Sequence, residues 1–155
     1  MCLDLHVPAP LPGNLVIVPT HRDPATALAL SSRNAYLSAA EFAYATVLVD
    51  ALRAGEAVFE AQRATPQGVR VADVLDAVRA SVRGVEEATT GVEGVDVRLV
   101  YAALNDPEEL WDLEEGEYAP QGGRLAPGKG AVLSGAVMLG RTRLIDNLVF
   151  GYPLN

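Results

Sequence analysis

Residues 28–41 of this chain of 155 residues, Leu-Ala-Leu-Ser-Ser-Arg-Asn-Ala-Tyr-Leu-Ser-Ala-Ala-Glu, join a polar segment to the start of a helix. Ser38 and Glu41 form a capping box, in which the serine side chain accepts from one backbone amide and the glutamate side chain reaches back to another. We expect the helix that opens there to run to about Arg53. Apolar residues recur at helical spacing up to that point, and Gly55 follows as a stop signal.

Beyond Gly55 the pattern of apolar residues predicts further helices and then strands. The expected helical segments lie at about 56–64 and 71–82, and a short helical turn is expected to start at 106–110. The expected strands lie at 95–104, 131–139 and 144–150, with a surface loop at 114–130. The sequence therefore predicts an α+β fold in which helices are followed by a small antiparallel β-sheet.

The first residues indicate a strand without its neighbours. We expect a flexible tail at 1–14, which is rich in proline. Residues 15–18, Leu-Val-Ile-Val, form an apolar run that Pro19 stops, which is typical of a buried strand. Such a strand needs neighbours on both sides, so we expect it to belong to the end of a larger sheet.

Composition and charge exclude several classes of function. The formal net charge is -8, and the 12 Lys and Arg residues form no run, which argues against nucleic acid as a partner. It does not exclude one nucleotide, because a few arginines and amides can hold a phosphate. No apolar run reaches the roughly 18 residues of a membrane helix. A single cysteine, Cys2, fits a reducing compartment, so we expect a cytoplasmic protein.

The polar segment before the capping box carries the chemistry. Ser31, Ser32 and Arg33 follow one another, and hydroxyls, backbone amides and a guanidinium fork can all bind phosphate oxygens. A solvated loop whose serines and Asn34 only stabilise turns explains the same residues. The residues alone leave both interpretations open.

Two stretches resemble a known family. Residues 19–23, Pro-Thr-His-Arg-Asp, followed by the Leu-Ala-Leu-Ser-Ser-Arg-Asn-Ala-Tyr-Leu run at 28–37, closely resemble the interdomain signature of the pantothenate synthetases (pantoate–β-alanine ligases). Downstream, 97–101 and 141–147 resemble that family's closing strands. The two stretches occur in the family's order at plausible spacing, so the resemblance favours phosphate binding over the solvated loop.

The resemblance implies a fold, a reaction and a site. The family condenses pantoate and β-alanine with ATP, through a pantoyl adenylate, in pantothenate and coenzyme A biosynthesis. It has an N-terminal nucleotide-binding domain and a C-terminal domain that closes over ATP. By resemblance, 15–37 is the interdomain strand and ATP-phosphate loop, and 38–155 is the C-terminal lid domain. Ser31, Ser32 and Arg33 would contact the triphosphate, while His21 and Leu30 would lie near adenine, largely through backbone atoms. Mg²⁺ would accompany ATP, held chiefly by phosphates and water, so no protein ligand is expected.

The chain departs from the family pattern in several places. Leu30 stands where methionine is usual, Asp23 replaces glutamate, and 24–27 is one residue longer than usual and lacks an Asp-Gly pair. The resemblance also places the family's histidine motif, pantoate-binding glutamines and Lys-Asp segment upstream of Leu15. We therefore expect this chain to need an N-terminal half for pantoate and β-alanine, and a homo-oligomer is a further expectation.

Alternatives stay open beside this interpretation. The chain could be a catalytically inactive regulatory module with the lid fold, or a generic α+β interaction domain in which Ser-Ser-Arg is coincidental. Tyr36 is expected to pack at the start of the helix. Asp146 could bind the interdomain segment or serve as a turn or cap. The acidic residues of 114–117 are expected to form a solvated loop rather than a metal site.

Overall fold

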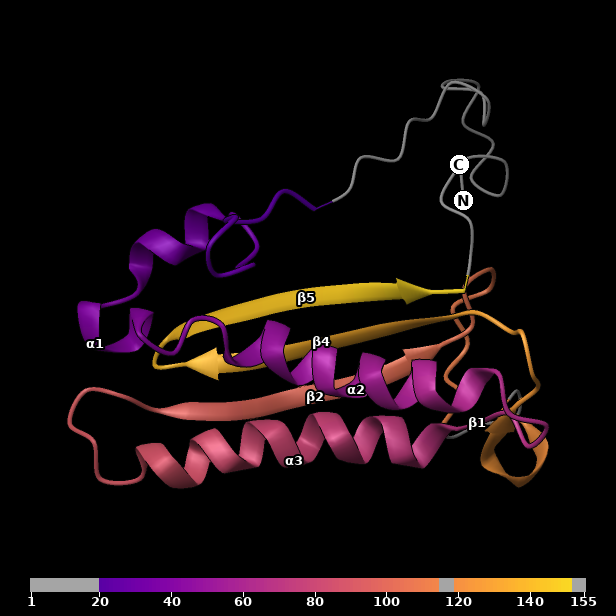
Figure 1. Cartoon of the computed structure of the whole chain (residues 1–155). Coiled ribbons are helices and arrows are strands. Elements are labelled where there is room, and N and C mark those ends of the chain that lie inside the picture. The colour runs from indigo at the N-terminus through magenta and orange to yellow at the C-terminus, as the bar shows by residue number, and fades with distance from the viewer. Residues whose placement is uncertain (1–19, 115–118, 152–155) are drawn as a thin grey trace, which may run out of the picture.

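The computed structural model describes residues 20–114 and 119–151. The expected tail at 1–14 and strand at 15–18 lie outside these residues. Two long helices, α2 (Val47–Arg63) and α3 (Val71–Thr89), pack on one face of a three-stranded antiparallel sheet (Figure 1). The sheet order is β2 (Val97–Asn105), β4 (Ala131–Leu139), β5 (Thr142–Phe150). The expected α+β fold is confirmed.

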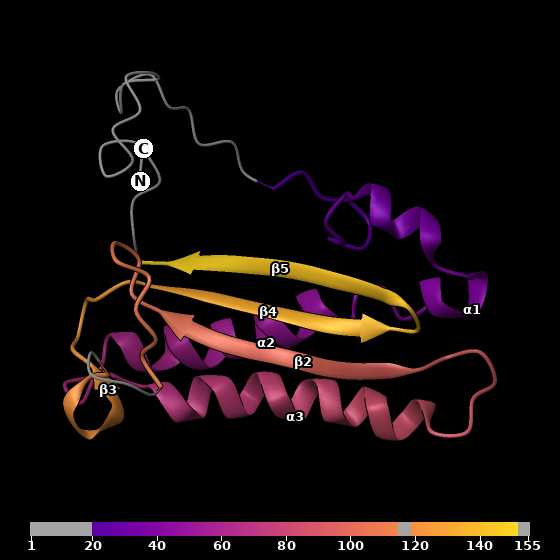
Figure 2. The ribbon, with the colours of Figure 1, turned by 180° about the vertical axis from the view of Figure 1, so that it is seen from behind.

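The remaining elements are short. They are η2 (Ser32–Tyr36), α1 (Ala39–Phe42), β1 (Val69–Arg70), η3 (Gln121–Gly123) and β3 (Arg124–Leu125). β1 and β3 pair as a separate two-stranded sheet. Seen from behind, β2 and β4 lie in front of α2, while α3 runs alongside β2 (Figure 2).

The core lies between the two helices and the inner face of the sheet. The face of α3 predicted to be apolar is buried, at Val71, Val74, Leu75, Val78 and Val82. Phe59 of α2 packs its ring 4.7 Å from the ring of Phe150 at the end of β5. Burying this continuous apolar face is the main term that holds helices and sheet together.

The expected helix stop at Gly55 is wrong, because α2 runs through it without a break. Gly55 is not among the residues with positive φ, so it does not act as a left-handed cap. Instead, a Cβ at Gly55 would lie 2.8 Å from Leu133 Cδ2 and 2.8 Å from Val78 Cγ2. The glycine allows α2 to approach α3 and β4 closely.

We expect Gly55→Ala to lower the free energy of unfolding by about 1–3 kcal/mol, the usual range for overpacking a filled core. Gly84→Ala is the matched control, because Gly84 also lies within a helix, but apart from its chain neighbours and the helix's own backbone no atom lies within 4 Å of its Cβ position. It should stabilise the chain by up to about 1 kcal/mol. Urea denaturation measures both, and equal stabilisation by the two substitutions would contradict the close packing at Gly55.

Other boundaries also differ from expectation. The capping box of Ser38 and Glu41 is present, but α1 ends at Phe42. Bonds between residues three apart then tighten the chain, from Tyr44 N to Glu41 O (2.9 Å) and from Val47 N to Tyr44 O (3.0 Å). α3 continues to Thr89 rather than ending near 82. The turn expected at 106–110 is present, at residues 107–109.

Candidate functional site

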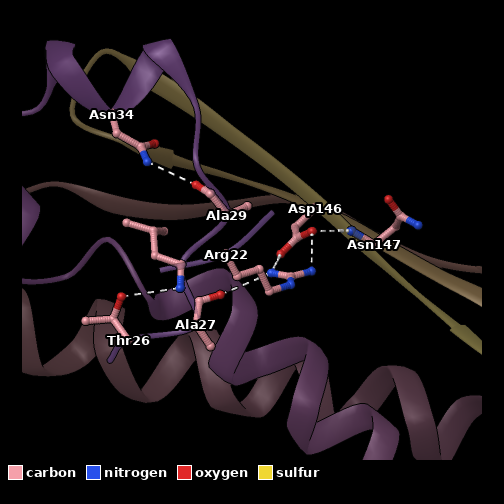
Figure 3. Close-up of polar contacts among 8 residues, drawn as sticks. Arg22, Thr26, Ala27, Ala29, Asn34, Asp146 and Asn147 are labelled. Carbon is pink, nitrogen blue, oxygen red and sulfur yellow. Dashed lines mark hydrogen bonds and ion pairs between the residues drawn. The ribbon is translucent and has the colours of Figure 1, made fainter. Parts of the chain in front are cut away.

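An ion pair attaches the polar segment to the edge strand of the sheet. Arg22 donates from Nη1 to Asp146 Oδ2 (2.6 Å) and from Nη2 to Asp146 Oδ1 (2.9 Å), across 124 positions of sequence (Figure 3). The Asp146 side chain is only 7 % exposed and that of Arg22 is 21 % exposed. These hydrogen bonds raise the pKa of the Arg22 guanidinium. The bidentate geometry fixes the segment in orientation as well as in position.

Residues 22–29 form a small hairpin above this ion pair. Arg22 and Ala29 face each other in an antiparallel bridge, and Arg22 Nη1 also donates to Ala27 O (3.2 Å). The carboxylate of Asp23 accepts from Thr26 N (2.8 Å) and Thr26 Oγ1 (2.9 Å), and these bonds lower its pKa. The loop therefore keeps this support at neutral pH and loses it when acid protonates Asp23.

Ala27 has a left-handed backbone conformation, which glycine adopts easily, although residues 24–27 lack the Asp-Gly pair of the family pattern. Its φ is 60°, in the left-handed region that residues other than glycine adopt at a cost of about 1–2 kcal/mol. The contacts from Asp23 and Arg22 hold the loop in this shape despite that cost. The longer 24–27 stretch is thus accommodated in an ordered turn.

The Ser-Ser-Arg residues follow this hairpin and begin η2. Ser31 is its N-cap, and its Oγ accepts from Arg33 N (3.2 Å), which leaves the hydroxyl hydrogen available to donate. Asn34 Nδ2 donates to Ala29 O (3.0 Å) and holds η2 against the hairpin (Figure 3). The side chains of Ser31, Ser32 and Arg33 are exposed.

The structure brings the five predicted site residues into one segment, with grooves on two sides. Ser31, Ser32 and Leu30 line a groove of about 570 Å³. Leu30 and Ser31 also line a second groove of about 560 Å³ over the uncovered sheet face, together with Ile145 of β5. Leu30 N donates to His21 O (2.9 Å), so His21 and Leu30 are neighbours and this amide is already used.

Two expectations about supporting residues now have outcomes. Asp146 binds Arg22, which lies in the segment expected to join two domains, although the sequence did not identify Arg22 as the partner. Tyr36 does not pack at the helix start, because its side chain is 77 % exposed. η2 is a short 3-10 helix with no buried residue, and the described residues leave Tyr36 largely uncovered.

The acidic loop residue Glu114 pairs with an arginine. Arg79 of α3 donates to both of its carboxylate oxygens, at 2.8 and 2.7 Å. The other acidic residues of that loop, at 115 and 117, lie outside the described residues. Within 20–114 and 119–151, no three His, Cys, Asp or Glu residues are grouped so that they could hold a metal ion.

Comparison with known proteins assigns the chain to a family. The model of the family described as pantoate-beta-alanine ligase matches residues 1–149. The chain belongs to this family. It is 36 % identical to the pantothenate synthetase of Chloroflexus aggregans over 147 residues, and 36 % identical to the bifunctional pantoate ligase/cytidylate kinase of Gloeobacter violaceus over 151 residues. The crystal structure of pantothenate synthetase from Thermus thermophilus superposes with a TM-score of 0.64 at 33 % identity.

The chain spans less than half the length of these pantoate–β-alanine ligases. The alignment with the Chloroflexus protein includes 95 % of this chain and 43 % of that protein. The alignment with the Gloeobacter protein includes 97 % of this chain and 24 % of that protein. For the Thermus structure the shares are 98 % and 44 %. Among the helices of the described residues, none is both long and apolar enough to cross a bilayer.

Proposed function

We propose that this chain is the C-terminal domain of a pantothenate synthetase and closes over ATP during catalysis. In this account residues 15–37 are the interdomain strand and ATP-phosphate loop, and 38–155 are the lid domain. The whole enzyme condenses pantoate and β-alanine in a cytoplasmic pathway to pantothenate and coenzyme A. Family membership and the partial coverage of each relative support this division.

One observation carries the proposal. The ion pair of Arg22 and Asp146 anchors the hairpin to β5, and the polar side chains of Ser31, Ser32 and Arg33, which follow the hairpin, are exposed. Within the described part of the chain, the Arg33 side chain makes no ion pair or hydrogen bond. An anchored loop with uncommitted donors is suited to bind a ligand, because no internal contact must break first.

The chemistry of adenylation explains why these donors are useful. A carboxylate oxygen of pantoate attacks the α-phosphorus of ATP, and the bond to the bridging oxygen breaks to release pyrophosphate. The amine of β-alanine then attacks the adenylate carbonyl, and AMP leaves. Ser31 and Ser32 would donate hydroxyl hydrogens to phosphate oxygens, and Arg33 would add a two-pronged, charge-assisted pair. Negative charge developing on the leaving pyrophosphate would thus be stabilised by this chain.

The adenine end of the nucleotide would lie against His21 and Leu30. Leu30 is 56 % exposed and offers an apolar side chain, and the two residues are joined by a backbone hydrogen bond. Since the Leu30 amide is used internally, its contribution is apolar contact and its carbonyl oxygen. Mg²⁺ would be held mainly by phosphate oxygens and water, as this ion prefers.

The uncovered face of the sheet would meet the nucleotide-binding half. Its exposed apolar residues include Tyr101 of β2, Ile145 of β5 and Leu110 of the loop after β2. All three line the same groove as Leu30. Burying such a patch against a second domain is favourable, and a homo-oligomer would bury it in the same way. With a net charge of -8, neither nucleic acid nor a membrane is a proposed partner.

Isolated, the 155-residue polypeptide should release no AMP when incubated with ATP, pantoate and β-alanine. The reason is that the residues proposed to bind pantoate belong to the other half of the enzyme. AMP release is measured against a blank without protein. Turnover by the purified chain alone would overturn its assignment as a lid domain.

A further inference from the structure

Two further arginines, Arg141 and Arg143, line a groove together with Arg33, and neither has yet been given a role. Arg33 of η2, Arg141 in the β4–β5 turn and Arg143 of β5 line one groove of about 410 Å³, together with Tyr36 and Thr142. We call it the arginine groove. Three of the chain's 12 basic residues therefore converge on one hollow of a protein whose net charge is -8.

The arginine groove has no internal counter-charge. No carboxylate among the described residues lines it, and neither Arg33 nor Arg141 makes an ion pair or a side-chain hydrogen bond there. Arg143 contacts only an aromatic face, with its guanidinium carbon 5.9 Å from the centre of the Tyr101 ring. Like charges gathered without an ion-pair partner repel one another, and a bound anion would relieve that repulsion.

Carboxylates lie in the two hollows next to the arginine groove. Asp146 lines the small cavity that Arg33 and Arg143 also line, and it is paired there with Arg22. Glu41 and Asp96 line the other hollow, which shares Tyr36, Arg141 and Thr142 with the arginine groove. Glu41 is already committed to the capping box, where its Oε2 accepts from Ser38 N at 2.7 Å. Neither Glu41 nor Asp96 forms an ion pair with Arg141 among the described residues, so an anion that bound Arg141 would break no ion pair there.

Arg141 lies in the tight turn between β4 and β5. Leu139 pairs with Thr142, so Gly140 and Arg141 form a two-residue hairpin loop. Gly140 has a φ of 56° while Arg141 does not have a positive φ, the pattern of a type II′ turn. Tyr36, which is 77 % exposed, lines the same groove. Its exposure, unexplained by packing, fits a role as a further donor.

The arginine groove is continuous with the proposed phosphate site. Arg33 and Arg143 also line the small cavity of about 40 Å³ that contains Ser31 and Asn34. A phosphate chain held by Ser31 would therefore extend past Arg33 toward Arg141. A linear anion with several charges can engage three guanidinium forks at once, which a single monoanion cannot.

We propose that the arginine groove binds the pyrophosphate part of ATP and the pyrophosphate released from it, with Arg141 and Arg143 as binding residues besides Arg33. This inference rests on the proposed function, because it assigns the far end of the same triphosphate. Arg141 and Arg143 would hold the β- and γ-phosphates and would steer the leaving group away from the adenylate.

Calorimetric titration of inorganic pyrophosphate into the 155-residue chain at low ionic strength tests the inference. We expect Arg141→Ala and Arg143→Ala each to raise the Kd about tenfold, the lower end for hydrogen bonds to a charged group. Arg53→Ala and Arg83→Ala are matched controls, since both arginines are exposed and unpaired within the described residues but lie on α2 and α3. Adenosine, which has no phosphate, should show no difference among variants.

A melting curve separates binding from structure. Without an anion, Arg141→Ala should melt no lower than the wild type, because it relieves repulsion. With the same concentration of pyrophosphate, the wild type and the controls should gain more stability than Arg141→Ala and Arg143→Ala. Three results would overturn the inference. They are no pyrophosphate binding by the wild-type chain, equal affinity of all variants, or inorganic phosphate bound as tightly as pyrophosphate. If Arg33→Ala alone weakened pyrophosphate binding, the inference would fail while the proposed function stood.

Discussion

Replacing Arg33 by alanine should lower kcat/KM for ATP by roughly ten- to a hundredfold in the joined enzyme. By joined enzyme we mean this chain fused behind the part of the Chloroflexus aggregans pantothenate synthetase that it does not match. A hydrogen bond to a charged group contributes about 1.5–3 kcal/mol, which corresponds to that loss of transition-state stabilisation. Arg33→Lys should restore only part of the rate, because a point charge replaces a planar fork.

The stability of the Arg33 variants separates binding from folding. Arg33 is exposed and its guanidinium has no partner in the described residues, so the melting temperature should barely change. Arg53→Ala, at an exposed position on α2, controls for the loss of one positive charge. Kinetics equal to the wild type would remove the phosphate role, whereas a large fall in melting temperature would make Arg33 a structural residue.

Asp146→Asn should have the second large effect, because it breaks the ion pair that anchors the loop. It should lower the free energy of unfolding by about 2 kcal/mol, since a mostly covered Arg22 loses its charged acceptor. In the joined enzyme kcat/KM should fall about tenfold, because a displaced loop no longer aligns Ser31 and Arg33 with the phosphates. Urea denaturation and steady-state kinetics measure the two effects.

Glu114→Gln is the matched control for this substitution. Glu114 also accepts two hydrogen bonds from an arginine, Arg79, but it tethers the loop after β2 rather than the polar segment. It should reduce stability without changing kcat/KM. A double-mutant cycle of Arg22→Ala with Asp146→Asn should show coupling above about 0.5 kcal/mol. Additive effects, or equal kinetic losses in the Glu114 variant, would contradict the anchoring role.

Much of the fold could be predicted from the spacing of apolar residues and from capping residues, because both depend only on residues that are near one another in sequence. The buried face of α3 follows directly from the spacing of its valines, and the capping box at Ser38 is present as expected. Gly55 shows the limit of such patterns. A glycine signals either a helix end or a close approach of two elements, and only the positions of Val78 and Leu133 decide between them.

The site was only partly predictable for a related reason. Ser31, Ser32 and Arg33 are neighbours in sequence, so a motif can identify them. The anchor joins Arg22 to a residue 124 positions away, and no local pattern links two such positions. The arginine groove likewise depends on the β4–β5 turn bringing Arg141 and Arg143 beside η2.

Activity of the joined enzyme tests the central claim most directly. With ATP, pantoate and β-alanine, it should form pantothenate and AMP in equal amounts, and a variant in which Ser31, Ser32 and Arg33 are all alanine should lose most of this activity. A melting curve verifies that both proteins are folded. A folded joined enzyme that binds ATP but makes neither AMP nor pantothenate would contradict the account and favour an inactive module with the lid fold.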